Sequence, residues 1–112
     1  MKIAVPVVGD KLCLHFGHCE KFAMVDVDTG AKTILKREDV VPPPHQPGVL
    51  PGWLHDQGAE IIFAGGMGVR AQDLFTQMGI KVMVGAPPAT PEEVINAWLD
   101  GTLNLGDNVC DH

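Results

Sequence analysis

Three things are scarce or missing in this chain: serine, basic charge and long apolar runs. It contains no serine at all, which excludes a serine nucleophile. Its 8 lysine and arginine residues are scattered, and the net charge is −6. A nucleic-acid interface needs a basic face to neutralise phosphates, so we expect no nucleic-acid partner. No apolar run approaches the roughly 20 residues of a membrane span, so we also expect no membrane partner.

Cysteine is also scarce, and the count is odd. Three cysteines cannot all pair with one another, so they are better explained as reduced metal ligands or core residues. The N-terminus begins directly with a strand-like run and lacks the basic segment, apolar segment and cleavage site of an export signal. The sequence therefore predicts a cytoplasmic protein.

The length and composition indicate one globular domain over residues 1–112. The chain has 46% hydrophobic and 20% charged residues, which is typical of globular proteins. Periodicity predicts a β-β-β-α-β-α-β-α order, an α/β fold with a mixed five-stranded sheet and three helices on its faces. The predicted strands cover residues 2–8, 22–28, 31–38, 60–64 and 80–84, and the predicted helices cover about 48–58, 69–78 and 91–101.

Two of the helices carry clear sequence signals. Thr90 and Glu93 form a capping box, and Gly101 suits the end of the last helix. In the middle helix a buried face is predicted from the i, i+3, i+4, i+7 spacing of Ala71, Leu74, Phe75 and Met78.

The densest group of potential metal ligands lies in the loop after the first strand. Cys13, His15, His18 and Cys19 fall within seven residues. Thiolate and imidazole are ligands for transition metals, but the crowding is unlike the paired spacing of a zinc site. We expect a subset of the four to meet an already assembled metal cluster. Alternatively, the two cysteines are small core residues and His15 binds a backbone carbonyl.

Two further segments are candidate parts of the same site. Gly65, Gly66, Met67 and Gly68 lie between a strand and a helix N-terminus, where backbone N–H groups can hold an anion, with Arg70 in the first helical turn. The alternative is a simple tight turn. At the other end of the chain, Cys110 and His112 either reach the first loop or belong to a frayed terminus.

These segments resemble the dinitrogenase iron–molybdenum cofactor biosynthesis family. The likeness rests on the opening strand, His15-Phe16-Gly17, Gly65 to Gly68 and the strand at 80–84. The proline-rich segment around His45 is similar to that of the family's small orange-protein branch. The resemblance implies a ribonuclease-H-like α/β fold without nuclease activity. It also implies that His15 is the best candidate ligand and that the glycine loop forms the floor of the site. Phe16 and Gly17 are further candidate cofactor contacts, although Gly17 alternatively serves only a turn.

The function predicted from the residues and the resemblance together is a non-enzymatic carrier of a metal–sulfur cluster. The resemblance implies either an iron–molybdenum cofactor precursor or a molybdenum–copper sulfide cluster, with cofactor-assembly proteins or an ATPase as candidate partners. The metal ligands predicted for it are His15, Cys19, His18, Cys13, Cys110 and His112. Two alternatives stay open: a simple zinc- or copper-binding module, and a thiol-dependent enzyme that uses Cys19.

Overall fold

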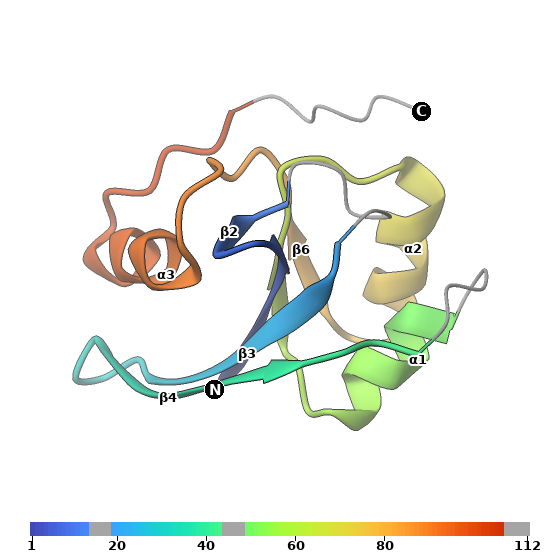
Figure 1. Ribbon diagram of the computed structural model, residues 1–112, viewed down its shortest axis with the longest axis horizontal. Helices are drawn as coiled ribbons and strands as arrows, with labels where there is room; N and C mark the ends of the chain where they lie inside the picture. The colour runs from blue at the N-terminus through green and yellow to red at the C-terminus, as the bar shows by residue number, and fades with distance from the viewer. Residues whose placement is uncertain (14–18, 44–48, 107–112) are drawn as a thin grey trace.

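The computed structural model describes residues 1–13, 19–43 and 49–106. Figure 1 shows its strands and helices. In chain order these are β1 (Lys2–Val8), β2 (Lys11–Leu12), β3 (Lys21–Asp28), β4 (Thr33–Val40), α1 (Val49–Asp56), β5 (Ile61–Phe63), α2 (Val69–Gln77), β6 (Lys81–Met83) and α3 (Pro91–Asp100). No helix in these described ranges has the length and hydrophobicity that crossing a bilayer requires.

The strands form one mixed sheet in the order β4-β3-β1-β5-β6, with the short β2 paired to β1. The pairs β1–β2, β1–β3 and β3–β4 are antiparallel, while β1–β5 and β5–β6 are parallel. The α/β class and the mixed sheet are therefore confirmed. The predicted count of five strands is wrong by one, because a two-residue strand is too short to produce an alternating pattern.

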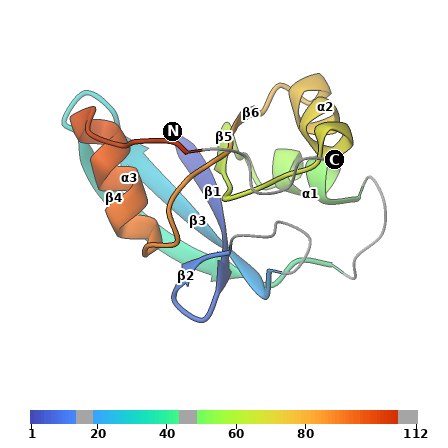
Figure 2. The same ribbon diagram turned by 90° about the horizontal axis from the view of Figure 1, so that it is seen from above.

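The helices cover the two faces of the sheet unequally, as Figures 1 and 2 show. Helices α1 and α2 pack on one face, where Phe22, Leu54, Ile62 and Phe75 belong to one buried cluster. Helix α3 packs on the opposite face through Val94 and Ile95, with Val5, Val25 and Phe63 in the same buried cluster. The sheet is thus buried on both sides, which agrees with the nearly continuous apolar sequence of β1.

The ends of α3 follow their sequence signals, and the buried face of α2 does so with one exception. The Thr90 hydroxyl accepts from the Glu93 N–H at 3.2 Å, and Gly101 ends α3 with a φ of 76°. Phe75 of α2 is fully buried, but the Met78 side chain is 44% exposed. The prediction of an inward-facing Met78 is therefore wrong: α2 ends at Gln77, and Met78 is the C-cap residue, where the backbone has already left the helical conformation (φ −84°, ψ 2°).

Candidate functional site

The candidate site lies where the carboxyl ends of three parallel strands meet. Strands β1, β5 and β6 run in the same direction, so the segments that follow them leave the sheet at one edge. After β1 the chain continues to β2 and β3, and β3 lies on one side of β1 in the sheet. After β5 it continues through α2 to β6, which lies on the other side, farther from β1. Such a switch in direction between neighbouring strands is where open α/β sheets bind ligands.

Backbone hydrogen bonds hold both ends of the cysteine-containing segment against β1. The Cys13 N–H donates to the Pro6 carbonyl at 2.8 Å, and the Glu20 N–H donates to the Val7 carbonyl at 2.9 Å. The Glu20 side chain in turn accepts from the Gly9 N–H at 2.8 Å. Cys13 and the residue that follows Cys19 are therefore both fixed at the end of the central strand.

The two cysteines differ in how deeply they are buried. The Cys13 side chain is 8% exposed and belongs to the core, whereas Cys19 is partly buried against the cluster beneath α1 and α2. Burial, together with the electrostatic influence of nearby Cys13, raises the pKa of Cys19 to about 11. The Cys19 thiol is therefore protonated at neutral pH, and a metal that binds it must displace the proton.

The glycine loop, defined here as residues 65–68, connects β5 to α2. Gly65 and Gly66 are buried, and the Met67 side chain is 1% exposed within the cluster beneath α1 and α2. Three carbonyls of the loop accept hydrogen bonds from neighbouring segments: Gly65 O from the Gly85 N–H at 3.0 Å, Met67 O from Gln72 Nε2 at 2.8 Å, and Gly68 O from the Gln72 N–H at 3.1 Å. The path of the loop is thus held from both the β6 side and the α2 side.

Helix α2 begins at the loop without a capping side chain. Gly68 is the N-cap residue, with φ −63° and ψ 153°, and it has no side chain that could accept from the first helical N–H groups. These N–H groups form the positive end of the helix dipole, which favours a negatively charged ligand. Arg70 in the same turn is exposed.

A contact that the sequence did not predict connects the segment after α3 to this edge. The Gly106 N–H donates to the Gly85 carbonyl at 2.7 Å, and Gly85 has a φ of +81°. Because Gly85 also bonds to Gly65, the chain around 106 lies next to the glycine loop. The only signal in the sequence was the presence of glycine at two positions far apart in the chain, and this did not indicate that they meet.

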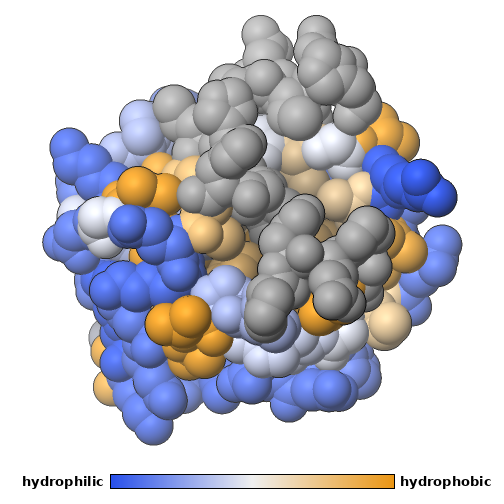
Figure 3. All heavy atoms as spheres, turned by 45° about the vertical axis from the view of Figure 1, so that its right-hand side comes forward, coloured by the Kyte–Doolittle hydropathy of each residue, from blue (hydrophilic) through white to orange (hydrophobic). Residues whose placement is uncertain are grey.

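Several exposed apolar side chains surround the same edge. Val8 ends β1, Val41 follows β4, Val69 begins α2 and Leu105 precedes Gly106, with exposures of 44%, 75%, 60% and 41%. Figure 3 brings the side with α1 and α2 forward and shows hydrophobic surface in several separate places among hydrophilic side chains. The edge is therefore less polar than the net charge of −6 alone suggests.

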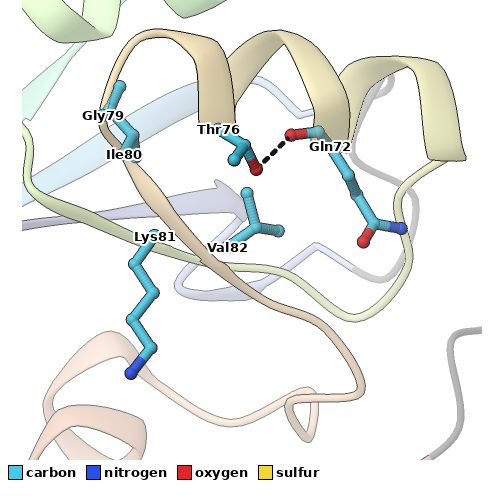
Figure 4. A pocket seen from close by; sticks show the side chains of 6 residues that line it. All are labelled: Gln72, Thr76, Gly79, Ile80, Lys81 and Val82. Atoms are coloured by element: carbon cyan, nitrogen blue, oxygen red, sulfur yellow. Dashed lines mark hydrogen bonds between the residues drawn. The ribbon is translucent and has the colours of Figure 1, made fainter.

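A separate pocket of about 450 Å³ lies between α2 and the edge strand β6. Figure 4 shows its lining side chains, among them Thr76, whose hydroxyl donates to the Gln72 carbonyl at 2.9 Å. The lining residues are Gln72, Thr76, Gly79, Ile80, Lys81 and Val82. Gln72 is the lining residue that hydrogen-bonds to the glycine loop, while the other lining residues belong to α2, β6 and the turn between them.

Most of the predicted metal ligands fall outside the described residues. These are His15, His18, Cys110 and His112, together with the predicted cofactor contacts Phe16 and Gly17. Within the described ranges, no group of three or more histidine, cysteine, aspartate or glutamate side chains is placed to hold a metal ion. The ligand set therefore stays a prediction, and the described residues contribute Cys13, Cys19, the glycine loop and Arg70.

Comparisons with known proteins identify a family and a shared fold. Residues 1–101 match the family model described as dinitrogenase iron-molybdenum cofactor. An uncharacterized protein of Methanocaldococcus jannaschii, MJ0580, is 29% identical over 109 residues, which is 92% of this chain and 89% of that protein.

Two solved structures show how far the fold is shared. The crystal structure of PH0822 is 31% identical and has a TM-score of 0.85, covering 94% of both chains. The apo form of the orange protein from Desulfovibrio gigas is 24% identical with a TM-score of 0.73, covering 96% of this chain and 93% of that one. At that identity, the likeness to the orange protein shows a common fold alone.

Proposed function

Because the chain belongs to the dinitrogenase iron–molybdenum cofactor family, we propose that it is a non-enzymatic carrier of a molybdenum-containing metal–sulfur cluster. The family resemblance predicted from the sequence is confirmed by the match over residues 1–101. The cargo is an iron–molybdenum cofactor precursor or a molybdenum–copper sulfide cluster. The protein binds this cargo and passes it on to a recipient protein without catalysing a reaction.

The proposal assigns coordination to the cysteine- and histidine-containing segments. His15 is the first candidate ligand, followed by Cys19, His18 and Cys13, with Cys110 and His112 assisting. Thiolate and imidazole are suitable donors for copper and for metal–sulfur clusters, whereas the chain's carboxylates suit harder ions. Phe16 and Gly17 belong to the same segment and are proposed to line the cluster.

The glycine loop is proposed to hold the sulfide side of the cluster. A metal–sulfur cluster of this kind is anionic, so its sulfides need hydrogen-bond donors. The uncapped start of α2 offers N–H groups and a favourable dipole at the same sheet edge as Cys13, and Arg70 adds a positive charge nearby. The observation that carries the proposal is this shared position of the cysteine segment and the glycine loop at the β1/β5 switch point.

The two alternatives predict different chemistry. A thiol-dependent enzyme needs a reactive Cys19 thiolate, but burial raises the pKa of Cys19 to about 11, which disfavours that role at neutral pH. A zinc- or copper-binding module would use the same Cys and His side chains for a single ion. Elemental analysis separates this second alternative, because it predicts stoichiometric zinc or copper without molybdenum or sulfide.

Reconstitution with tetrathiomolybdate and Cu(I) under anaerobic conditions tests the proposal. We expect a visible charge-transfer absorption and bound molybdenum in the unmutated protein, with strong loss in His15→Ala and in the Cys13→Ala/Cys19→Ala double variant. His55→Ala is the matched control, because His55 is an exposed histidine on α1. Absence of both signals from the unmutated protein would contradict the proposal.

Other features of the protein are proposed on the same basis. We propose that residues 1–112 act as one unit, that the sheet topology is ribonuclease-H-like, and that the protein works in the cytoplasm. The exposed apolar residues around the site suit transient contact with cofactor-assembly proteins or an ATPase.

A further inference from the structure

Gln72 makes two hydrogen bonds to successive carbonyls of the glycine loop. Its side-chain Nε2 donates to Met67 O at 2.8 Å, and its backbone N–H donates to Gly68 O at 3.1 Å. The backbone bond is the ordinary first bond of a helix, but the side-chain bond is additional. It joins the helix to a residue whose side chain is 1% exposed, so the anchored end of the contact lies in the core.

The side-chain bond determines where the next N–H points. In a trans peptide unit, the C=O and the following N–H lie in one plane and point in opposite directions. Because Gln72 holds the Met67 carbonyl on the α2 side, the Gly68 N–H points away from the Gln72 amide. The Gly85 N–H holds the Gly65 carbonyl in the same manner, so the Gly66 N–H points away from β6.

The loop needs such a restraint because glycine does not supply one. A peptide unit next to glycine rotates more freely than others, since no Cβ restricts φ and ψ. The Gly68 backbone, with φ −63° and ψ 153°, is a conformation that serine, threonine or aspartate also adopts at an N-cap. With glycine there instead, no side-chain oxygen competes with a ligand for the first helical N–H groups, and none fixes the peptide unit.

We propose that Gln72 is a positioning residue that aims the Gly68 N–H at the anionic side of the bound cluster. This role rests on the proposed function, because it concerns the same glycine loop. Gln72 itself does not touch the cluster. It acts by holding the Met67–Gly68 peptide unit in one orientation, so that the hydrogen-bond donor is in place before the cluster arrives.

The test compares Gln72→Met with Gln77→Met, using tetrathiomolybdate with Cu(I) as the probe. Methionine keeps the length and helix propensity of glutamine but has no donor. Gln77 is exposed at the end of the same helix. We expect Gln72→Met to bind the probe roughly 3- to 10-fold more weakly, the effect of one hydrogen bond, and Gln77→Met to bind as the unmutated protein does.

A second readout separates positioning from general stability. In the unmutated protein we expect the ¹H–¹⁵N resonance of the Gly68 amide to shift when the probe binds. In Gln72→Met this shift should be lost or reduced, at a temperature where both proteins are fully folded. Equal affinity and an equal Gly68 shift in Gln72→Met would overturn the positioning role alone. No binding by the unmutated protein would overturn both this role and the proposed function.

Discussion

Gly85 and Gly106 are packed backbone against backbone, and only glycine fits at position 85. A Cβ built on Gly85 would lie 2.0 Å from the Gly106 carbonyl oxygen, and the φ of Gly85 is +81°. The contact joins the end of β6 to the chain beyond α3, while the Gly85 N–H bonds to Gly65 in the glycine loop. Position 85 therefore holds two segments of the candidate site together.

Gly85→Ala should destabilise the protein by at least about 2 kcal/mol, because a left-handed φ disfavours alanine and the contacting atom is backbone, which cannot move aside cheaply. Gly52→Ala is the control: Gly52 lies within α1, and a Cβ there meets nothing within 4 Å. That change should be neutral or stabilise by roughly 0.5–1 kcal/mol. Urea denaturation of the three proteins measures both values, and equal effects of the two substitutions would contradict the packing argument.

Arg37 joins β4 to α3 through an ion-pair network. Its Nη1 contacts both Glu92 oxygens at 2.8 Å, and its Nε contacts Asp39 at 2.8 Å. Hydrogen bonds from Arg37 hold the pKa of Asp39 below its ordinary value. Burial raises the pKa of Glu92, but the hydrogen bond from Arg37, a backbone hydrogen bond and the positive charge of Arg37 together leave the pKa of that carboxyl lowered as well.

The network predicts a pH dependence of stability with a definite sign. For carboxyls with lowered folded pKa values, stabilisation is present above the ordinary pKa of about 4 and is lost as pH falls through the folded pKa. Arg37→Met should cost about 1 kcal/mol near neutral pH and should flatten the loss of stability below about pH 4. Lys36→Met removes the same charge from an exposed neighbour. The free energy of unfolding of both variants is measured by denaturation across this pH range. Identical pH dependence of the two values would show that the ion-pair network does not contribute to stability.

The elements that the sequence predicted well are those with local causes. The start of α3 depends on Thr90 and Glu93, three residues apart, and its end depends on the backbone freedom of Gly101. The parallel pairing of β5 and β6 follows from the helix between them, and the buried face of α2 around Phe75 follows from its spacing. Each of these signals lies within a few residues of the structure it determines.

The features that were missed depend on contacts between distant residues. Gly85 and Gly106 are 21 positions apart, and neither position alone indicates the other. Gln72 lies between Ala71 and Asp73 and reads as an ordinary polar residue of a helix surface, although its side chain holds Met67 O. Of the candidate site, the sequence predicted the glycine loop and both described cysteines, but not what holds them in place. The role of His15 stays a prediction.

The reactivity of Cys19 distinguishes a buried ligand from a catalytic thiol. Burial and the electrostatic influence of nearby Cys13 raise the pKa of Cys19 to about 11, compared with about 8.5 for a free thiol. The smaller thiolate fraction outweighs the greater nucleophilicity of each thiolate, so alkylation at pH 7 should be on the order of tenfold slower than for a free thiol. Mass spectrometry of iodoacetamide-treated, metal-free protein gives the rate at Cys19. A rate equal to or above that of free cysteine would instead favour the thiol-dependent enzyme.

The last residues of the chain can be tested separately from the family's shared part. The family match ends at residue 101, and Gly106 is the last described residue, bonded at the sheet edge beside the glycine loop. Cys110 and His112 follow within six residues, a reach of roughly 20 Å for extended chain. Loss of a group that hydrogen-bonds to a metal ligand usually costs 10- to 100-fold in metal affinity, so removal of the ligands themselves should cost at least about tenfold.

Cys110→Ala/His112→Ala should therefore weaken binding of tetrathiomolybdate and Cu(I) by at least about tenfold, while leaving the unfolding midpoint unchanged because Gly106 keeps its bond to Gly85. Asn104→Ala is a control in the same segment that removes no ligand. Bound molybdenum per protein, measured by elemental analysis across a titration, gives the affinity. If the double variant binds the cluster as tightly as the control, the metal ligands lie entirely within residues 13–19, and the tail serves only to hold the edge through Gly106.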